Sequence, residues 1–270
     1  MSCDNDCKAC KDKCAFEKLQ ANDKSKINKV IGVVSAKGGV GKSYVTTLLA
    51  NALAKKGYKV GILDADLTGP SIPASYGLHG MITSEDGVNI EPAEAANGVK
   101  VVSMNLLMEH ETDPLVWRGP MLMGALRQFY QNVNWGELDY LLVDMPPGTS
   151  DIQLSIYQLY PLNGLVIVTS SQELVDMIVQ KAFKMAGLMH IKVYGLVENM
   201  AYFICDECQK KHYIFGAPKA AVLAEKFGVK DYAALALKPE NTRYIDLGQA
   251  DILIENELDG IVKALEENLR

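Results

Sequence analysis

A short glycine-rich connection between an apolar run and a helical pattern constrains the fold of this chain more than any other feature. Residues 30–35 (VIGVVS) form a continuous run rich in β-branched side chains, which is typical of a buried parallel strand. Residues 42–56 place apolar side chains on one side of a helix, which Gly57 ends. The connection between them, AKGGVGKS, holds three glycines whose backbone N–H groups can turn inward toward an anion. The chain is therefore expected to contain a phosphate-binding loop at a helix N-terminus.

The residue types in this connection predict how a nucleotide would be held. Lys42 can reach the β- and γ-phosphates, and the hydroxyl of Ser43 can bind Mg²⁺. The other expected nucleotide contacts are Gly38, Gly39, Val40, Gly41 and Tyr44. The motif departs from G-x-x-x-x-G-K-[ST], because Ala36 stands at the first glycine and an additional lysine, Lys37, precedes the glycine pair. The alternative is an ordinary glycine-rich turn, which the flanking strand and helix and the GKS ending disfavour.

Two later apolar runs each end in aspartate. Residues 59–63 are followed by Asp64 and Asp66, and residues 140–143 are followed by Asp144. Because ligands of α/β sheets bind at the carboxyl ends of the strands, we expect these carboxylates near the phosphate loop. An apolar strand that ends in Asp typically holds Mg²⁺, and the N–H of Gly148 in the next loop can meet a γ-phosphate. Asp64 and Asp66 can bind a metal-bound water or orient the attacking water, or they can be turn residues.

Strand and helix patterns alternate along the rest of the chain. Further strands are expected at 99–103, 165–169 and 192–197, and helices at 121–133, 151–159, 173–188, 219–227 and 253–269. Residues 68–98 and 231–250 are rich in loop signals and carry no assignment. The alternation predicts an α/β fold with a doubly wound, mostly parallel sheet covered on both faces. Residues 27–270 are expected to form one domain, and residues 1–26 a polar, Cys-rich N-terminal tail.

Composition excludes several classes of protein. The chain has 270 residues, with 27 Lys and Arg against 33 Asp and Glu, so its net charge of −6 argues against nucleic acid as the main partner. No stretch approaches the roughly 20 apolar residues of a membrane helix, and the N-terminus lacks the apolar core of a signal peptide. We therefore expect a cytoplasmic protein with no membrane partner. Clustered cysteines in a reducing compartment indicate metal or redox ligands.

Several motifs resemble one group of nucleotide-dependent proteins. KGGVGKS at residues 37–43 resembles the deviant P-loop of the MinD/ParA/nitrogenase-iron-protein class of P-loop NTPases, the SIMIBI class. DMPPGTSD at residues 144–151 is similar to D-x-P-P-G-T-G-D of the Mrp/ApbC iron–sulfur cluster carrier ATPases, with Ser150 in place of the usual glycine. Residues 116–121, 135–140 and 195–200 also look like blocks of that family, so that the resemblance covers about residues 29–230.

The resemblance implies a mechanism. It implies a homodimer that encloses ATP between its subunits, with Lys37 acting across the interface. Lys42 and Asp66 would join Lys37 in catalysis, with Asp66 orienting water, and Ser43 and Asp144 would hold Mg²⁺. Asn199 would recognise adenine, because an amide offers both a donor and an acceptor, although a turn role is open. ATP hydrolysis would drive the loading of a cluster or its transfer to apo iron–sulfur proteins.

The pair Cys205 and Cys208 has the C-x-x-C spacing that can direct two sulfurs at one metal. Two thiolates half fill a four-ligand site, and a two-fold dimer axis beside the loop would supply the other two. The resemblance implies that the four thiolates bridge one [4Fe–4S] cluster. Zinc would accept the same thiolates, and His212 could join it as a ligand. A redox disulfide is a third alternative.

A second group of cysteines lies in the tail. Cys3, Cys7, Cys10 and Cys14 would form one stripe of a helix, but that stripe would be about 16 Å long. The tail must therefore loop around a metal, or its cysteines act in pairs. Four thiolates suit a second [4Fe–4S] cluster or zinc, and a metal-free tail is the remaining alternative.

Two other functions are alternatives to the cluster carrier. A MinD/ParA-like positioning ATPase would bind a membrane or DNA, which the acidic balance of residues 254–270 disfavours. An ATP-dependent reductase like the nitrogenase iron protein also bridges one cluster across a dimer, but its cysteines lie far apart in sequence.

Overall fold

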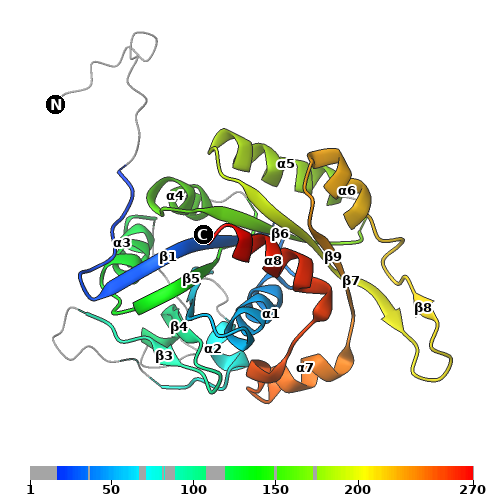
Figure 1. The fold of residues 1–270 in the computed structure, drawn as a ribbon, viewed down its shortest axis with the longest axis horizontal. Coiled ribbons are helices and arrows are strands. Elements are labelled where there is room, and N and C mark those ends of the chain that lie inside the picture. Colours follow the sequence, from blue (N-terminus) through cyan, green and yellow to red (C-terminus); the bar gives the residue numbers. More distant parts are fainter. Residues whose placement is uncertain are drawn as a thin grey trace, which may run out of the picture.

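The centre of the protein is a nine-stranded sheet with the order β3-β4-β2-β5-β1-β6-β7-β8, in which β9 also pairs with β7. The computed structural model describes residues 17–35, 37–66, 71–80, 82, 89–107, 119–148, 151–172 and 175–269. The strands are β1 (Ser25–Ser35), β2 (Val60–Asp64), β3 (Ala93–Glu94), β4 (Lys100–Ser103), β5 (Gly136–Asp144), β6 (Gly164–Ser170), β7 (Val193–Ile204), β8 (Lys211–His212) and β9 (Tyr232–Ala236). Within the described part of the chain, only β3 and β8 pair antiparallel. The predicted doubly wound, mostly parallel α/β fold is confirmed (Figure 1).

Helices cover both faces of the sheet (Figure 1). They are α1 (Lys42–Lys55), α2 (Ile72–Ser75), α3 (Gly119–Gln131), α4 (Asp151–Leu159), α5 (Val175–Leu188), α6 (Ala220–Phe227), α7 (Pro239–Asp246) and α8 (Asp259–Glu267), with 3₁₀ turns η1 (Met104–Leu107), η2 (Ala250–Ile252) and η3 (Asn256–Leu258). No helix in the described residues is both long and apolar enough to cross a bilayer.

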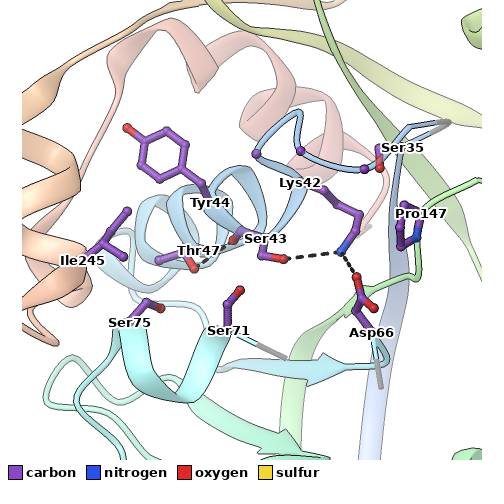
Figure 2. A pocket seen from close by; sticks show the side chains of 13 residues that line it. Ser35, Lys42, Ser43, Tyr44, Thr47, Asp66, Ser71, Ser75, Pro147 and Ile245 are labelled. Carbon is purple, nitrogen blue, oxygen red and sulfur yellow. Dashed lines mark hydrogen bonds and ion pairs between the residues drawn. The ribbon is translucent and has the colours of Figure 1, made fainter. Parts of the chain in front are cut away.

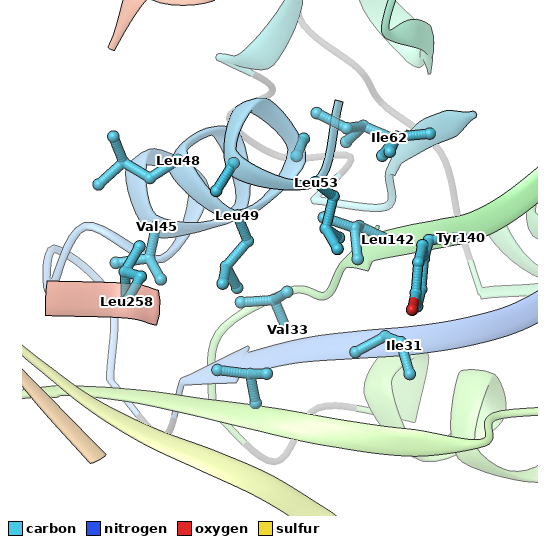
Figure 3. Packing of buried hydrophobic residues seen from close by; sticks show 14 of the residues in the cluster. Ile31, Val33, Val45, Leu48, Leu49, Leu53, Ile62, Tyr140, Leu142 and Leu258 are labelled. Atoms are coloured by element: carbon cyan, nitrogen blue, oxygen red, sulfur yellow. The ribbon is translucent and has the colours of Figure 1, made fainter. Parts of the chain in front are cut away.

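Side-chain alternation along β1 divides the core into two clusters. Ile31 and Val33 face α1 and α8 in one cluster, which Figure 3 shows around Leu49. Val30 and Val34 face α3, α4, α5 and α6 in the other. Because both faces of the central strands are buried, their sequences are continuously apolar, which is why the strand positions were predictable.

The register of the central strands brings the predicted site residues to one edge. Asp64, the last residue of β2, pairs with Asp144, the last residue of β5. Asp144 also lies opposite Val33 of β1, just before the glycine loop. The phosphate loop and the acidic strand ends therefore lie at the same carboxyl edge of the sheet, as predicted.

Two expected elements are corrected by the structure. The strand predicted at 192–197 continues to Ile204, because Tyr202 pairs with Ala236 of β9 and Phe203 pairs with His212 of β8. Asn199 therefore lies within the strand and not after it. The helix predicted at 253–269 is confined to α8, preceded by η3. The unassigned stretches 68–98 and 231–250 contain α2, β3, β9 and α7.

Residues before β1 pack against the body of the domain. Leu19 is buried in the cluster that contains α4, and its N–H donates to the carbonyl oxygen of Leu159 at 2.8 Å. The Nζ of Lys18 donates to the carbonyl oxygen of Tyr157. These contacts fasten the chain to α4 ahead of the predicted division at residues 26 and 27. Cys3, Cys7, Cys10 and Cys14 lie outside the described residues.

Candidate functional site

The glycine loop is shaped by left-handed backbone at two positions. Gly39 has φ 78° and Gly41 has φ 80°, a region that residues with a Cβ rarely adopt. Gly41 also precedes α1 as its N-cap. A Cβ at Gly41 would lie 2.2 Å from the Nδ2 of Asn199, whose amide donates to the carbonyl oxygen of Val40 at 3.0 Å. Asn199 therefore holds the loop from β7, and glycine at position 41 leaves room for it.

Three side chains converge on Asp144 at the base of the loop. The Nζ of Lys42 and the Oγ of Ser43 each lie 2.6 Å from its Oδ2, and the Oγ1 of Thr46 lies 2.8 Å from its Oδ1. Asp144 is completely buried and Lys42 is 6% exposed, so the charge pair is shielded from water. Ser43 and Asp144, the predicted Mg²⁺ ligands, are in contact, and Thr46 is a partner that the motif analysis did not include.

The two remaining aspartates occupy different environments. The Oδ2 of Asp66 lies 3.9 Å from the Nζ of Lys42 and faces the loop cavity (Figure 2). Asp64 is buried beneath it, where its carboxylate accepts the N–H of Asp66 at 3.2 Å. Burial, together with the negative charge of Asp144, raises the pKa of Asp64 to about 7. Asp66 is thus placed to meet a ligand, and Asp64 to shape the turn that presents it.

Two cavities adjoin the loop. The first, of about 310 Å³, is lined by loop glycines and by Lys42, Ser43 and Asp66 (Figure 2). The second, of about 180 Å³, is lined by Asn199 and Asn241. Tyr44 and Ile245 line both cavities, so they form a shared wall.

Tyr44 is held in that wall by hydrogen bonding. Its hydroxyl accepts the Nδ2 of Asn241 at 2.6 Å, and the same amide also bonds to the carboxylate of Glu255. Burial raises the pKa of Tyr44 to about 12, so the hydroxyl stays protonated at neutral pH. Asn241 was not predicted, because it lies in a stretch that carried no assignment from the sequence.

Lys37 and Gly148 are the chain neighbours of Gly38 and Pro147, which line the first cavity, and both have partners of their own. The exposed Nζ of Lys37 donates to the Oε1 of Gln172, just after β6, a contact that the sequence did not suggest. The N–H of Gly148, which has φ 83°, donates to the carbonyl oxygen of Ser35 at 3.0 Å. The predicted contact between this N–H and a γ-phosphate therefore requires that bond to open.

The predicted metal-binding cysteines lie at the far end of β7. The β7–β8 hairpin projects from the sheet at the edge of the molecule, and the chain then returns to α6 (Figure 1). Cys205 lies directly after β7, and Cys208 lies in the turn. One ligand atom each of Cys205, Cys208 and His212 lies within 4.8 Å of the others. The backbone N–H groups of Cys208 and Glu207, and then the Cys208 side chain, lower the pKa of the Cys205 thiol. The arrangement can hold a thiophilic metal at the surface.

A comparison with protein families assigns the chain to a family. Residues 26–269 match the family described as ParA: NUBPL iron-transfer P-loop NTPase. The chain belongs to this family. It therefore contains an ATPase domain of the P-loop class, and the predicted resemblance to the Mrp/ApbC-type carriers is confirmed.

Individual relatives agree with this family assignment. An iron-sulfur cluster carrier protein of Clostridium perfringens is 48% identical over 244 residues, covering 87% of this chain and 86% of the relative. One of Methanocaldococcus jannaschii is 39% identical over 282 residues, covering 99% of this chain and 97% of the relative. These matches extend over nearly the full length of both proteins.

Solved structures agree with the fold. A nucleotide-binding protein of Archaeoglobus fulgidus in complex with ADP, with Co found by PIXE, is 42% identical, with a TM-score of 0.77 over 86% of this chain and 91% of that one. The cell division ATPase MinD of Pyrococcus furiosus is 18% identical, with a TM-score of 0.62 over 89% of this chain and 98% of that one. The second likeness concerns the fold alone.

Proposed function

We propose that this protein is an ATP-binding and ATP-hydrolysing carrier that assembles a [4Fe–4S] cluster between two copies of the chain and transfers it to apo iron–sulfur proteins. One observation carries the proposal. The strand β7 holds Asn199 against the phosphate loop and ends next to the half-buried Cys205, which is followed by the exposed Cys208. The nucleotide loop and the metal-binding hairpin are thus joined by one element. Because a carrier of this kind works where thiols stay reduced, we propose a cytoplasmic location.

The loop residues fit a magnesium-bound nucleoside triphosphate. The glycines expose backbone N–H groups, Lys42 supplies positive charge, and the Ser43 hydroxyl and Asp144 carboxylate already lie together as oxygen ligands for Mg²⁺. Bound Mg²⁺ would neutralise charge on the phosphate oxygens. The second cavity fits the base, with the Asn199 amide as donor and acceptor. The ADP bound by the Archaeoglobus fulgidus relative supports this assignment.

Hydrolysis needs a positioned water and additional positive charge. Asp66 faces the first cavity and would orient the water that attacks the γ-phosphorus, while the bond to the β-phosphate oxygen breaks and its electron pair remains on ADP. Lys37 is exposed next to Gly38, which lines the first cavity, and would leave Gln172 to reach a nucleotide in the partner subunit. Lys42 would stabilise the same developing charge from within its own subunit.

The hairpin supports a cluster shared between two copies. Each chain offers two thiolates, Cys205 and Cys208, and a [4Fe–4S] cluster requires four. Because Cys208 is exposed and the hairpin extends from the sheet, a second copy can approach it (Figure 1). Opening such a dimer would expose the cluster to an acceptor. The names of the relatives, iron-sulfur cluster carrier proteins, support cluster delivery as the function.

A transfer assay tests the proposal. Reconstituted protein would be mixed without oxygen with an apo [4Fe–4S] enzyme, and recovery of enzyme activity would be followed with and without Mg-ATP. Asp66→Asn is expected to bind ATP and to lower the hydrolysis rate by about 10²–10⁴-fold. Asp246→Asn, an exposed carboxylate on α7, is the matched control and should keep the wild-type rate. A reconstituted protein that activates no acceptor, or equal hydrolysis in both variants, would contradict the proposal.

A further inference from the structure

We propose that Met200 is a positioning residue in β7 through which a nucleotide base in the second cavity fixes the β7–β8 hairpin. The backbone of Met200 is strained, and it lies between the nucleotide site and the hairpin. The inference rests on the nucleotide-binding part of the proposed function. It does not depend on the cluster or on a second copy of the chain.

The backbone of Met200 is left-handed inside a strand. Its φ is 54°, a value that residues with a Cβ rarely adopt. Among the described residues other than glycine, only His190 and Gln209 also have a positive φ, and both lie outside helices and strands. Strain of this kind persists where the surroundings impose it, and it is concentrated at ligand sites and switch regions. Met200 is therefore the described non-glycine position at which such strain interrupts a strand.

The pairing of β7 changes at the same place. Glu198 lies opposite Ala234 of β9, and Tyr202 lies opposite Ala236. Between these pairs β7 has residues 199–201 where β9 has only residue 235, which is a bulge of a kind that is rare between parallel strands. The pairing of β7 with β6 ends just before Met200, and its pairing with β8 begins shortly after it. The bulge therefore separates the part of β7 that pairs with β6 from the part that leads into the hairpin (Figure 1).

Hydrogen bonds anchor the chain on both sides of Met200. Before it, the Asn199 amide donates to the carbonyl oxygen of Val40 in the phosphate loop. After it, the carbonyl oxygen of Tyr202 accepts the N–H of Leu237 at 2.7 Å. Asn199, Met200 and Leu237 all line the second cavity. A base in this cavity would therefore contact the strained residue and also Leu237, which anchors the chain just beyond it.

Two residues before Met200, a buried carboxylate oxygen has no hydrogen-bond partner among the described residues. The Oε2 of Glu198 accepts two N–H groups at the start of α6, whereas its buried Oε1 accepts none. An unpartnered buried oxygen costs free energy, as does the left-handed backbone of Met200. Both costs narrow the free-energy gap between this arrangement of β7 and another. A strand of this kind has two arrangements whose balance a ligand shifts.

The base would select one of these arrangements. By packing against Met200 and Leu237, it would stabilise the bulge, and with it the part of β7 that pairs with β8. The hairpin would then open less often when a nucleotide is bound. The coupling is reciprocal, so that a change that holds the hairpin closed would also tighten nucleotide binding. The signal comes from the base, because the phosphates bind at the loop and do not contact Met200.

Hydrogen exchange with two ligands tests the inference. The metal-free full chain is measured alone, with saturating Mg-ADP, and with Mg-pyrophosphate, which offers the phosphates without the base. The N–H groups of Cys205 and Gln209 are hydrogen-bonded within the hairpin and report its opening, and the amides of residues 38–43 report occupancy of the loop. Met200→Leu keeps an apolar side chain on the strained backbone, and Met200→Gly removes both the side chain and the strain. His190→Gly, at φ 53° in the turn before β7, relieves the same strain elsewhere and is the matched control.

We expect Mg-ADP to slow exchange at Cys205 and Gln209 by about 5-fold or more, the lower end of typical coupling between sites. Mg-pyrophosphate should protect the loop amides and leave the hairpin amides unchanged. Met200→Leu and His190→Gly should keep the response of the hairpin to Mg-ADP, and Met200→Gly should lose it.

A wild-type hairpin that does not respond to Mg-ADP, or that responds equally to Mg-pyrophosphate, would overturn the inference. A full response in Met200→Gly would also overturn it. The two ligand measurements use the wild-type chain, so they decide the outcome even if Met200→Gly does not fold. Bound ADP with an unresponsive hairpin would contradict this inference alone, whereas a chain that binds no ADP would contradict the proposed function.

Discussion

The nucleotide loop and the metal hairpin lie on connected elements but are built by opposite means. Around the loop, Lys42 and Asp144 are buried and paired at 2.6 Å at the centre of the sheet edge. On the hairpin, Cys208 and His212 are exposed, and their ligand atoms approach without burial. The first region is organised by the core, and the second by a turn and one short strand pair.

This difference indicates what each region can do. A buried site in which Lys42 and Asp144 are already paired holds that part of its geometry before a ligand arrives, which suits phosphate chemistry. A surface hairpin with few buried contacts opens locally at a low cost in free energy, which suits a metal that must be taken up and passed on. Substitutions in the loop should therefore affect both stability and activity, whereas those in the hairpin should affect metal binding alone.

The largest effect is expected from Lys42→Met. It leaves the buried carboxylate of Asp144 without its cation, which should lower the free energy of unfolding by about 3–5 kcal/mol and abolish ATP hydrolysis. Urea unfolding and a phosphate-release assay measure the two effects. Lys56→Met removes an exposed ion pair to Glu266 and is the control, with a change within about 0.5 kcal/mol. Equal losses in both variants would remove the contrast between buried and surface charge.

The next largest effect separates two glycines of the same loop. Gly39→Ala and Gly41→Ala both force a side chain into left-handed backbone, at about 1–2 kcal/mol each. Only at Gly41 does the new Cβ meet Asn199, so that variant should lose about 1 kcal/mol more and should bind ATP less tightly than Gly39→Ala. Unfolding and nucleotide titration of both variants measure the difference. Indistinguishable variants would mean that Asn199 does not hold the loop.

A third effect concerns the buried part of β7, away from the hairpin turn. Glu198, buried on β7 beside Asn199, accepts the N–H groups of Lys219 and Ala220 at 2.7 and 2.6 Å, where the chain returns to α6. Glu198→Ala should cost about 0.5–2 kcal/mol and speed hydrogen exchange at both amides, because it removes their acceptor. Glu198→Gln keeps an oxygen and should lose less. Unchanged hydrogen exchange at both amides in Glu198→Ala would show that this carboxylate does not hold the chain at the start of α6.

The smallest effect on stability is expected from Cys205→Ser combined with Cys208→Ser. Both residues lie outside the two core clusters, so the free energy of unfolding of the metal-free protein should change by no more than about 0.5 kcal/mol. Metal binding by the hairpin should nevertheless disappear. Thermal unfolding together with metal analysis checks both parts. A large loss of stability in the metal-free variant would place the hairpin in the core of the fold.

The accuracy of the predictions from sequence also differs between the nucleotide loop and the hairpin. The strands around the loop and the positions of Lys42, Asp66 and Asp144 were predictable, because buried strands are apolar throughout and the ligand residues follow them directly. The contact of Asn199 with Val40 was not, since it depends on packing between β7 and the loop. The extension of β7 to Ile204 was missed, because its last residues pair with β8 and β9 and are only partly buried. Gln172 and Asn241 carry no motif, and only the fold brings them to the site.

Metal and sulfide analysis by native mass spectrometry, on protein reconstituted without oxygen, tests the central claim most directly. It compares the wild type, the chain with its four tail cysteines replaced by serine, and Cys205→Ser with Cys208→Ser. The account predicts that the tail variant retains four irons and four sulfides per two chains, and that the hairpin variant loses them. Zinc without sulfide in the tail variant, or a full cluster in the hairpin variant, would contradict a cluster held between two hairpins.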